Sequence, residues 1–480
     1  MYISYDDTIV APATIPGTGA ITVLRLSGTK ALQIADKVLK CSEGTICDTQ
    51  GFRIRFCKAY SSSGAELDEV LASVFHSPHS YTGEDSVEIS CHASKYITEQ
   101  LILAIVNAGA RMAEPGEFTR RAFVNGKLDL AQAEAVADVI ASQSKAAFNV
   151  AYNQMKGGFS KELKQMRDEL LHITSLMELE LDFSEEEVEF ADRKQLKLLV
   201  DNELLHIAGL ISSFSAGNAI KNGVPVVIVG AANSGKSTLL NDLLGEDRAI
   251  VSDVPGTTRD TIEETMNLDG VLFRFIDTAG IRSTTETVEK IGIERTFLKI
   301  SEASVVLGLL DAGASVDENR SSSSLIVSKV DLSRQKLFLL LNKIDKFSTT
   351  DLNSDHLCFN KNVSTLNEIV SNSDNKIVAL SISAKSMTGI SALKSAISDS
   401  QKDLLGDSDT TMVTNLRHYE ALKNIHTSLS RVRSGLDTRI PTDLIAQDLR
   451  EALYYLGTIV GEITTDEVLG NVFKNFCIGK

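Results

Sequence analysis

The sequence predicts a multidomain protein with a small α+β domain at its N-terminus and, after it, a discontinuous all-α helical domain that contains an inserted α/β domain. Over about the first 120 residues, short β-rich runs alternate with helical stretches and Gly/Pro turns, which is typical of an α+β domain. Apolar residues recur at helical spacing in two separate regions, at 130–221 and after 411. Between these regions stand apolar runs that end in polar motifs, the pattern of a parallel sheet.

Length, composition and charge agree with a globular chain of several domains. The 480 residues correspond to about three domains of ~150 residues each. Hydrophobic residues make up 43% and charged residues 23%, and the net charge of −16 argues against indiscriminate binding to nucleic acid or anionic membranes. No apolar run approaches the ~20 residues of a membrane span, and Asp6 and Asp7 stand where a signal peptide would be basic. We therefore expect a cytoplasmic protein.

The six cysteines show no CxxC pair and no metal-ligand spacing with histidine. Structural zinc and a disulfide framework are therefore not expected. Most of these cysteines should be ordinary buried thiols, because free cysteine behaves as a small hydrophobic residue.

The N-terminal strands are expected at residues 21–26, 52–56 and 86–90, with a turn at 15–19. The first helical region carries an apolar stripe with steps of three and four residues: Leu163, Met166, Leu170, Ile173 and Met177. The second region carries two such stripes: Leu422, Ile425, Leu429 and Val432, then Ile445, Leu449, Ala452, Leu456 and Ile459.

Neither helical region has an obvious full core of its own. We therefore expect one helical domain split by an insertion, which is tolerated when the ends of the insert lie close together. The insert opens with the continuous apolar run at 224–229, as a buried parallel strand would. Inside it, the Ser/Asp/Asn-rich stretches 311–334 and 347–375 are expected to form surface loops.

A phosphate-binding motif, GxxxxGKS, follows the strand at 224–229 and precedes a helix-forming run, which is the context that gives this motif its meaning. Its glycines allow backbone N–H groups to surround phosphate oxygens. Lys236 is expected to reach the β- and γ-phosphates, and Ser237 to hold Mg²⁺. The residues assigned to nucleotide contact here are Asn233, Ser234, Gly235, Lys236, Ser237 and Thr238.

A second motif, DTAG, ends the apolar run at 271–276 and comprises Asp277, Thr278, Ala279 and Gly280. Asp277 can reach the Mg²⁺ through water, and the N–H of Gly280 can donate to the γ-phosphate. Between the two motifs, the stretch 256–260 reads as a switch loop with Thr258 as the second hydroxyl ligand of Mg²⁺. The residues assigned to nucleotide contact in this region are Ser252, Asp253, Val254, Pro255, Gly256, Thr257 and Thr258.

Two further motifs select the base. Asn342, Lys343 and Asp345 follow the apolar run at 336–341, and the carboxylate of Asp345 can accept from both the ring N–H and the amino group of guanine. Adenine offers neither donor there, so an unpaired acceptor would cost orders of magnitude in affinity. Ser383, Ala384 and Lys385 follow the run at 377–380 and can present a backbone N–H to the guanine oxygen. All four motifs follow strands, so the sequence predicts GTP binding at the carboxyl edge of a parallel sheet.

The expected chemistry is hydrolysis of GTP to GDP and phosphate, with an unusual way of positioning water. Many small GTPases place a glutamine after the DxxG motif, but here that residue is Ile281. The side-chain oxygen of Asn233 is suited to a monovalent cation in the space that an arginine finger would fill, so we expect potassium dependence. Glu289 could orient water, although spacing alone favours a solvated helix-face glutamate.

Taken together, the motifs resemble the MnmE (TrmE) family of tRNA wobble-uridine modification GTPases. The resemblance covers nearly the whole chain, and the terminal FCIGK pentapeptide is the most specific match. The other matching segments are 7–11, 24–28, 81–85, 115–118, 125–135, the four nucleotide motifs and the Arg417–His418 pair.

The resemblance implies a tetrahydrofolate-binding and dimerisation domain at 1–122, a helical domain at 123–220 and 401–480, and an inserted Ras-like G domain at 221–400. It implies a homodimer that assembles with the FAD-dependent MnmG into a heterotetramer or a larger complex. Such complexes add a carboxymethylaminomethyl or aminomethyl group to carbon 5 of the tRNA wobble uridine. The one-carbon unit comes from 5,10-methylenetetrahydrofolate or 5-formyltetrahydrofolate, and GTP, Mg²⁺ and K⁺ are required.

The resemblance also assigns residues by motif position. Folate is expected at Arg25, Glu88, Lys127 and Lys480, and potassium at Asn233, Ser252, Val254 and Thr257. Glu289 matches a water-orienting glutamate and, with Lys236, is assigned a catalytic role. Cys477 matches a cysteine implicated in the modification chemistry, with a plain thiol on a flexible tail as the alternative.

The chain departs from the family pattern at a few positions. Residues 91–94 read CHAS where the family usually has GHGG, and residues 17–19 read GTG in place of GRG. Added Cβ atoms at these positions could narrow the neighbouring pocket or shift a turn. Ser252 replaces a family threonine and keeps its hydroxyl.

Two other functions use the same nucleotide motifs. A ribosome-assembly switch would need an RNA-binding appendage such as a KH domain, and the sequence has no GXXG loop in that setting. A dynamin-like membrane scaffold would need a basic amphipathic helix or a lipid anchor, and neither motif is found. Because the chain is acidic, we expect MnmG to supply most of the basic surface for tRNA and this chain alone to bind tRNA weakly, with a shallow salt dependence.

Overall fold

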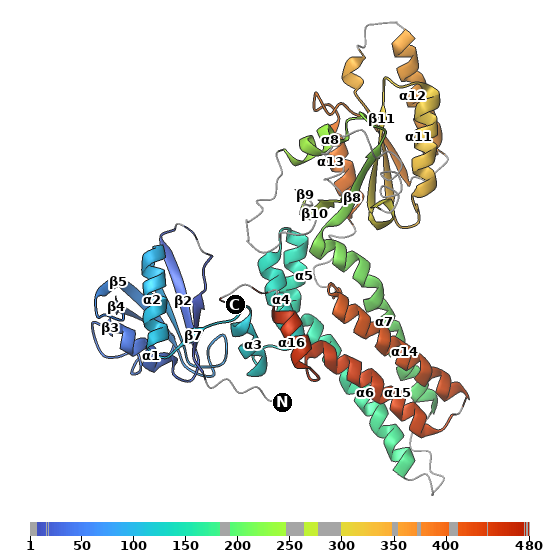
Figure 1. The fold of residues 1–480 in the computed structure, drawn as a ribbon. Coiled ribbons are helices and arrows are strands. Elements are labelled where there is room, and N and C mark those ends of the chain that lie inside the picture. The colour runs from blue at the N-terminus through green and yellow to red at the C-terminus, as the bar shows by residue number, and fades with distance from the viewer. Residues whose placement is uncertain are drawn as a thin grey trace. The chain divides into compact units, whose positions relative to one another are not determined.

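The structure is a computed structural model, and it describes residues 7–15, 17, 19–182, 193–245, 264–276, 299–347, 354–371, 376–402, 411–438, 440–474, 476 and 479. Two compact units are distinguished in it. One comprises Met1–Ala137, Gln154–Leu205 and Ala421–Lys480, and the other comprises Asp138–Asn153 and His206–Glu420. Each unit contains one of the two sheets (Figure 1).

The first unit contains a seven-stranded sheet in the order β3-β4-β5-β6-β2-β1-β7, antiparallel except for the parallel pair β1–β7. Its strands are β1 (Ile9–Pro12), β2 (Ile21–Ser27), β3 (Leu39–Cys41), β4 (Arg53–Tyr60), β5 (Glu66–Phe75), β6 (Ser86–His92) and β7 (Arg111–Met112). Helices α1 (Ala31–Val38) and α2 (Lys95–Asn107) pack on one face of this sheet (Figure 1). The mixture of strands and helices confirms the expected α+β class.

Alternation along the strands explains which face the helices cover. Leu24 and Leu26 of β2 and Val87 and Ile89 of β6 are fully buried in the core beneath α1 and α2. Because successive side chains of a strand point to opposite faces, the residues between them, such as Arg25, lie on the other face.

Two cysteines behave differently from expectation. Cys41 of β3 stands directly opposite Cys57 of β4, and the two form a disulfide. The expectation of ordinary free thiols is therefore wrong for this pair, since antiparallel pairing brings together residues that share no sequence motif. Cys91 is a buried free thiol, as expected, whereas the free thiol of Cys47 is exposed.

The helices bury the stripes that the sequence predicted. All five residues of the first stripe lie on α6 (Gly158–Asp182) and are at most 1% exposed. The later stripes lie on α14 (Leu416–Thr438) and α15 (Thr442–Val460), and α15 packs along α6. The described residues also form the helices α3 (Glu117–Val124), α4 (Leu130–Ala141), α5 (Lys145–Met155), α7 (Arg193–Asn222) and α16 (Asp466–Phe473).

The second unit contains a six-stranded sheet in the order β13-β12-β11-β8-β10-β9, parallel except for β9 at one edge. Its strands are β8 (Val224–Gly230), β9 (Glu264–Leu268), β10 (Val271–Phe275), β11 (Val305–Asp311), β12 (Lys336–Asn342) and β13 (Ile377–Ser381). Helices α8 (Lys236–Leu244) and α13 (Ile390–Asp399) pack on one face, and α11 (Val316–Lys329) and α12 (Ser354–Ser371) on the other (Figure 1). This arrangement confirms the α/β domain.

The expectation of surface loops at 311–334 and 347–375 is wrong, because these stretches contain α11 and α12. Serine and asparagine are poor helix formers, but Ser315 and Glu318 form a reciprocal capping box that begins α11. The apolar residues Ile326 and Leu366 then anchor the two helices in the core.

Within the part of the chain that the structure describes, no helix is both long and apolar enough to cross a membrane. In the same residues, no group of three or more His, Cys, Asp or Glu side chains forms a metal-binding cluster.

Candidate functional site

The phosphate loop connects β8 to the N-terminus of α8. Asn233 and Gly235 adopt positive φ angles of 61° and 102°, and a Cβ atom at Gly235 would overlap the side-chain nitrogen of Asn342. Only glycine allows this close approach. Lys236 donates from Nζ to the main-chain oxygens of Gly230 and Ala231, at 2.9 and 2.8 Å. Burial lowers the pKa of this ammonium group below its ordinary value.

The base-recognition motif is tied to the phosphate loop by a buried amide. Asn342 is 2% exposed, and its Nδ2 donates to the main-chain oxygen of Ser234 at 2.9 Å. Its Oδ1 accepts from the backbone N–H of Ala384 at 3.0 Å. One side chain at the end of β12 thus joins the segments that follow β8 and β13.

Asp345 lies in a short 3₁₀ turn, Ile344–Lys346, directly after β12. Its Oδ1 accepts from the buried hydroxyl of Ser383 at 2.6 Å, while the residue itself is exposed. Ser383 therefore orients the carboxylate that the sequence assigned to guanine. Lys385, which follows Ser383 and Ala384 in the sequence, is exposed.

Lys343 connects the base motif to the phosphate loop a second time. Its Nζ donates to the main-chain oxygen of Asn233 and to Oδ2 of Asp311, both at 2.6 Å. Asp311, the last residue of β11, was not among the predicted site residues. The rule that found the other motifs, a polar residue at the carboxyl end of a strand, would also have pointed to it.

Of the predicted nucleotide and ion ligands, the structure describes those in the loop after β8, the base motif and the segment after β13. In the first turn of α8, Ser237 is half-buried and Thr238 is exposed. The other predicted residues lie outside the described residues: Ser252, Asp253, Val254, Pro255, Gly256, Thr257, Thr258, Asp277, Thr278, Ala279, Gly280, Glu289, Cys477 and Lys480.

Two of the predicted folate residues lie directly opposite each other on neighbouring strands of the N-terminal sheet. Arg25 of β2 is directly opposite Glu88 of β6 and donates to its Oε1 from Nε at 2.9 Å, and Arg25 Nη2 lies 2.8 Å from the same oxygen. The guanidinium carbon lies 4.9 Å from the ring centre of Tyr81 and 5.6 Å from that of Phe118. Cation–π contacts and the ion pair thus hold Arg25 in place. Tyr81 lies in a matching motif but was not predicted as a site residue.

Lys127, the third predicted folate residue, packs on the loop that carries Tyr81. Its Nζ donates to the main-chain oxygen of Pro78 at 3.1 Å. A Cβ atom at Gly83 would lie 3.2 Å from the Lys127 side chain, which places the two residues in contact.

A fully buried arginine forms an ion pair with the same loop. Arg121 of α3 is 0% exposed and contacts three carboxylates: Asp7 Oδ1 at 2.7 Å, Glu84 Oε1 at 3.0 Å and Glu117 Oε1 at 3.0 Å. Burial alone would raise the pKa of Glu117, but hydrogen bonds from Arg111, the Glu114 backbone and Arg121 lower it below its ordinary value. Glu117 is therefore ionised at neutral pH.

The end of the chain lies against the N-terminal sheet and α3. Phe473 and Phe476 pack beside Gly116, where a Cβ atom would lie 2.8 Å from the Phe473 oxygen and 2.9 Å from the Phe476 Cβ. A Cβ atom at Gly479 would overlap the main-chain oxygen of Pro12, the last residue of β1. The preceding residue of β1, Ala11, is paired with Arg25. Gly479 thus lies against the strand that neighbours the Arg25–Glu88 pair.

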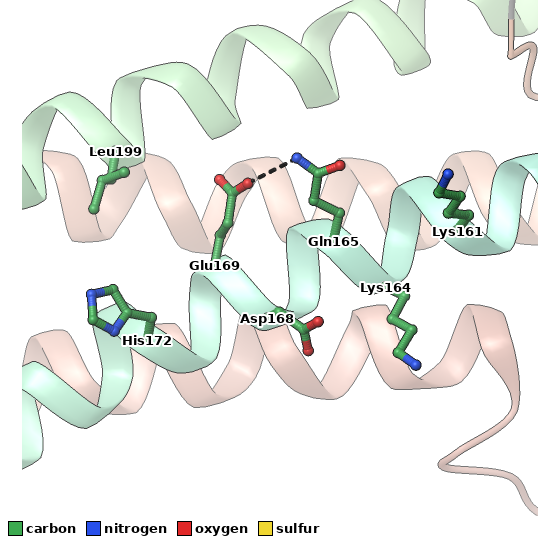
Figure 2. A pocket seen from close by; sticks show the side chains of 7 residues that line it. All are labelled: Lys161, Lys164, Gln165, Asp168, Glu169, His172 and Leu199. Carbon is green, nitrogen blue, oxygen red and sulfur yellow. Dashed lines mark hydrogen bonds between the residues drawn. The ribbon is translucent and has the colours of Figure 1, made fainter.

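A hollow of about 500 Å³ lies between α6 and α7, and none of its lining residues is among the predicted site residues (Figure 2). In it, Gln165 Nε2 donates to Oε1 of Glu169 at 3.2 Å. Glu203 of α7 is 4% exposed, and burial, followed by its hydrogen bond with Glu169, raises its pKa from 4.5 to about 8. The residues lining the hollow are Lys161, Lys164, Gln165, Asp168, Glu169, His172 and Leu199.

Comparison with known proteins accounts for nearly the whole chain. The family model described as the GTP-binding protein TrmE N-terminus matches residues 8–127, and the model of the MnmE helical domain matches residues 130–477. A tRNA modification GTPase MnmE from Parabacteroides distasonis is 46% identical over 477 residues, which cover 98% of this chain and 100% of that protein. One from Flavobacterium johnsoniae is 47% identical over 480 residues, covering 99% of each chain.

Among solved structures, the FeoB G-domain from Methanococcus jannaschii matches 38% of this chain and 98% of its own length at 26% identity, with a TM-score of 0.26 that is too low to bear on the fold. The two family models and the full-length relatives decide the assignment. The chain belongs to the MnmE family of tRNA modification GTPases.

Proposed function

We propose that this chain hydrolyses GTP to GDP and phosphate and acts in tRNA modification. The observation that carries the proposal is the buried side chain of Asn342, which joins the phosphate loop at Ser234 to the segment at Ala384. These three segments follow β8, β12 and β13, which are parallel strands of one sheet with β11 between β8 and β12, and in such sheets ligands bind outside the carboxyl ends.

Guanine is the base that fits the described residues. Asp345 offers an exposed carboxylate whose Oδ1 accepts one hydrogen bond from the Ser383 hydroxyl. Oδ2 and the remaining lone pair of Oδ1 can accept from the two adjacent donors of guanine. The preorganised carboxylate would be left unpaired by adenine, and that mismatch excludes ATP.

The phosphates and Mg²⁺ are proposed to bind at Lys236 and Ser237. In the structure Lys236 is satisfied by two neutral carbonyls, and charged phosphate oxygens are stronger acceptors for an ammonium group. Ser237 and Thr258 would hold Mg²⁺, with Asp277 acting through water. When bound, Mg²⁺ neutralises the charge that develops on the phosphates during transfer.

We propose that hydrolysis depends on K⁺ held by Asn233, Ser252, Val254 and Thr257, the last three of which lie outside the described residues. The exposed side chain and positive φ of Asn233 suit a residue that presents an oxygen to a bound ion. When bound, K⁺ supplies positive charge near the transferring phosphate. Glu289 would orient the attacking water.

Folate is proposed to bind on the N-terminal domain, at residues 1–122, which would also form the homodimer. Both contacts of Arg25 fall on Oε1 of Glu88, so Oε2 is the oxygen that can accept from the amino and ring N–H groups of a pterin. Lys127 and Lys480 would hold the folate carboxylates. When bound, 5,10-methylenetetrahydrofolate or 5-formyltetrahydrofolate supplies the one-carbon unit.

The binding partners proposed for this chain are those of the MnmE family. The homodimer would assemble with the FAD-dependent MnmG in the cytoplasm, and the complex would add a carboxymethylaminomethyl or aminomethyl group to carbon 5 of the tRNA wobble uridine. Cys477 is proposed to take part in that chemistry. The net charge of −16 supports weak tRNA binding by this chain alone.

The experiment that tests the proposal is mass spectrometry of tRNA nucleosides from a strain that lacks this chain. Loss of the wobble modification, and its return with the wild-type chain but not with Lys236→Ala or Arg25→Ala, is the expected result. Unchanged wobble uridines in the deletion strain would refute the proposal.

A further inference from the structure

Asp311 occupies a central position at the edge of the sheet where the nucleotide is proposed to bind. It is the last residue of β11 and is paired in the parallel register with Asn342, the last residue of β12. It therefore lies between the base motif and the strand that leads into the phosphate loop, since β11 is hydrogen-bonded to both β12 and β8. The proposed chemistry gives Asp311 no role so far.

The carboxylate of Asp311 is held in one orientation. Oδ1 accepts from the backbone N–H of Gly313 at 2.9 Å, and Oδ2 accepts from Lys343 Nζ at 2.6 Å. The main-chain oxygen of Asp311 accepts from Nδ2 of Asn319, a residue that is 7% exposed in α11. A side chain with both oxygens occupied and its backbone anchored has little rotational freedom.

The ammonium group of Lys343 carries this constraint to the phosphate loop. Nζ lies 2.6 Å from Asp311 Oδ2 and 2.6 Å from the main-chain oxygen of Asn233. The Lys343 side chain is 24% exposed and that of Asp311 is 28% exposed, so the pair is only partly screened by water. Burial alone would raise the pKa of Asp311, but the hydrogen bonds from Lys343 and Gly313 lower it, which keeps the carboxylate charged at neutral pH.

Asn233 and Lys343 both have left-handed backbones, with φ angles of 61° and 70°. Residues other than glycine rarely adopt this conformation, asparagine less rarely than most, and contacts with their surroundings stabilise it. The hydrogen bond from Lys343 to the Asn233 carbonyl is such a restraint. Because the backbone dihedral sets the direction of the Cα–Cβ bond, it also restricts the positions that the Asn233 side-chain oxygen can reach.

We propose that Asp311 is a positioning residue for GTP hydrolysis, which acts through Lys343 on Asn233 and thereby sets the oxygen that Asn233 offers to the activating monovalent cation. The inference rests on the proposed potassium dependence. In this arrangement the ammonium group of Lys343 links the base-recognition motif to the cation ligand Asn233. The positions of the base-recognition motif and of the cation site therefore depend on each other.

The test compares Asp311→Ala with Asp317→Ala in the full-length chain. Asp317 is an exposed carboxylate in the first turn of α11, so its substitution removes the same charge close by in the chain without touching Lys343. GTP turnover is measured at saturating GTP and Mg²⁺ over a range of KCl concentrations, with choline chloride keeping the ionic strength constant. The GDP dissociation constant is measured separately without potassium, and thermal denaturation checks folding.

For Asp311→Ala we expect the potassium concentration at half-maximal turnover to rise by about tenfold, the size of effect expected when one charge-assisted hydrogen bond is lost. The kcat should recover at saturating potassium. Asp311→Asn, which keeps one acceptor, should fall between Asp311→Ala and the wild type. Asp317→Ala should match the wild type. These shifts distinguish positioning of the cation site from a loss of folding, which would lower kcat at every potassium concentration.

An unchanged potassium requirement in Asp311→Ala, with weaker GDP binding alone, would confine Asp311 to the base site and overturn the inference while leaving the proposed function intact. Equal turnover of the wild-type chain in sodium and potassium would instead overturn the proposed potassium dependence itself, and the role of Asp311 with it.

Discussion

The side-chain nitrogen of Asn342 lies 2.9 Å from the main-chain oxygen of Ser234, so a residue of the base-recognition motif supports the phosphate loop from within the sheet edge. The same amide accepts from Ala384 through its oxygen. We therefore expect recognition of the base and binding of the phosphates to depend on this one buried side chain. Five predictions follow from this and from the other contacts described above.

Replacing Asn342 with alanine should weaken binding of GDP and GTP alike. The change removes two hydrogen bonds and leaves the Ser234 carbonyl and the Ala384 N–H without their partner. Each such loss costs ~1–3 kcal/mol, so we expect GDP affinity to fall by at least about 30-fold in equilibrium titration with a fluorescent GDP analogue. Asn360→Ala, on α12, is the matched amide control and should bind GDP normally. An Asn342→Ala chain with wild-type affinity would contradict the proposed role.

Replacing Asp345 with asparagine should change which base is bound. The asparagine amide opposes a donor of guanine with a donor of its own, whereas xanthine has a carbonyl oxygen at that position. We expect GDP affinity to fall by about 100-fold or more and xanthosine diphosphate to bind more tightly than GDP. Competition titrations with GDP, ADP and xanthosine diphosphate measure this order, with Asp317→Asn as the control. Persistence of the wild-type order would show that another residue selects the base.

Replacing Arg121 with methionine should destabilise the first unit strongly. Arg121 is fully buried and contacts Asp7, Glu84 and Glu117. Asp7 and Glu117 would keep their contacts with Arg111, but Glu84 would lose its ion pair and the buried site would lose one positive charge. Breaking a buried ion pair from one side costs ~3–5 kcal/mol in the free energy of unfolding.

Chemical denaturation measures this loss, and Arg120→Met is its neighbour control. The Arg120–Glu114 pair is more exposed, and surface pairs contribute at most about 1 kcal/mol. Similar effects of the two substitutions would show that the buried network contributes no more than a surface pair.

Replacing Glu203 with glutamine should stabilise the chain in a pH-dependent way. Burial raises the pKa of Glu203 in the folded chain to about 8 from 4.5. Because the folded chain holds this proton more tightly than the unfolded chain, the wild type loses stability as the pH rises from about 4.5 to about 8.

Glutamine mimics the protonated acid at every pH, so the gain in melting temperature of Glu203→Gln over wild type should be small near pH 5 and greatest at and above pH 8. Asp168→Asn, an exposed carboxylate of the same hollow, should show no such trend. A melting-temperature difference that stays constant from pH 5 to pH 9 would mean that Glu203 ionises normally.

Replacing Gly479 with alanine should disturb the docking of the C-terminal tail. A Cβ atom at this position would overlap the Pro12 oxygen, and the φ of 99° is unfavourable for alanine. We expect wobble-uridine modification in complemented cells to fall at least about tenfold while GTP turnover stays within about twofold of wild type. Gly470→Ala is the control, because nothing lies within 4 Å of a Cβ atom there. Normal modification by Gly479→Ala would mean that docking of the tail is not required.

Local sequence patterns alone determined much of the fold and of the candidate site. The GxxxxGKS, NKID and SAK motifs each follow an apolar strand, and because parallel strands end at one edge, their meeting in space could be predicted without coordinates. The apolar stripe of α6 was equally readable, since helical spacing places Leu163 and Met177 on one face whatever packs against it. The capping box at Ser315 was also present in the sequence, but the serine-rich composition around it masked the helix.

Other features were decided only by the tertiary structure. Arg121 meets Asp7 across 114 positions of sequence, Cys41 meets Cys57 through strand pairing, and Asp311 meets Lys343 through the order of the sheet. The raised pKa of Glu203 and the packing of Gly479 on Pro12 likewise depend on which elements pack together. Periodicity in a sequence specifies which face of an element is buried, but only the paired strands and packed helices specify which distant residue that face meets.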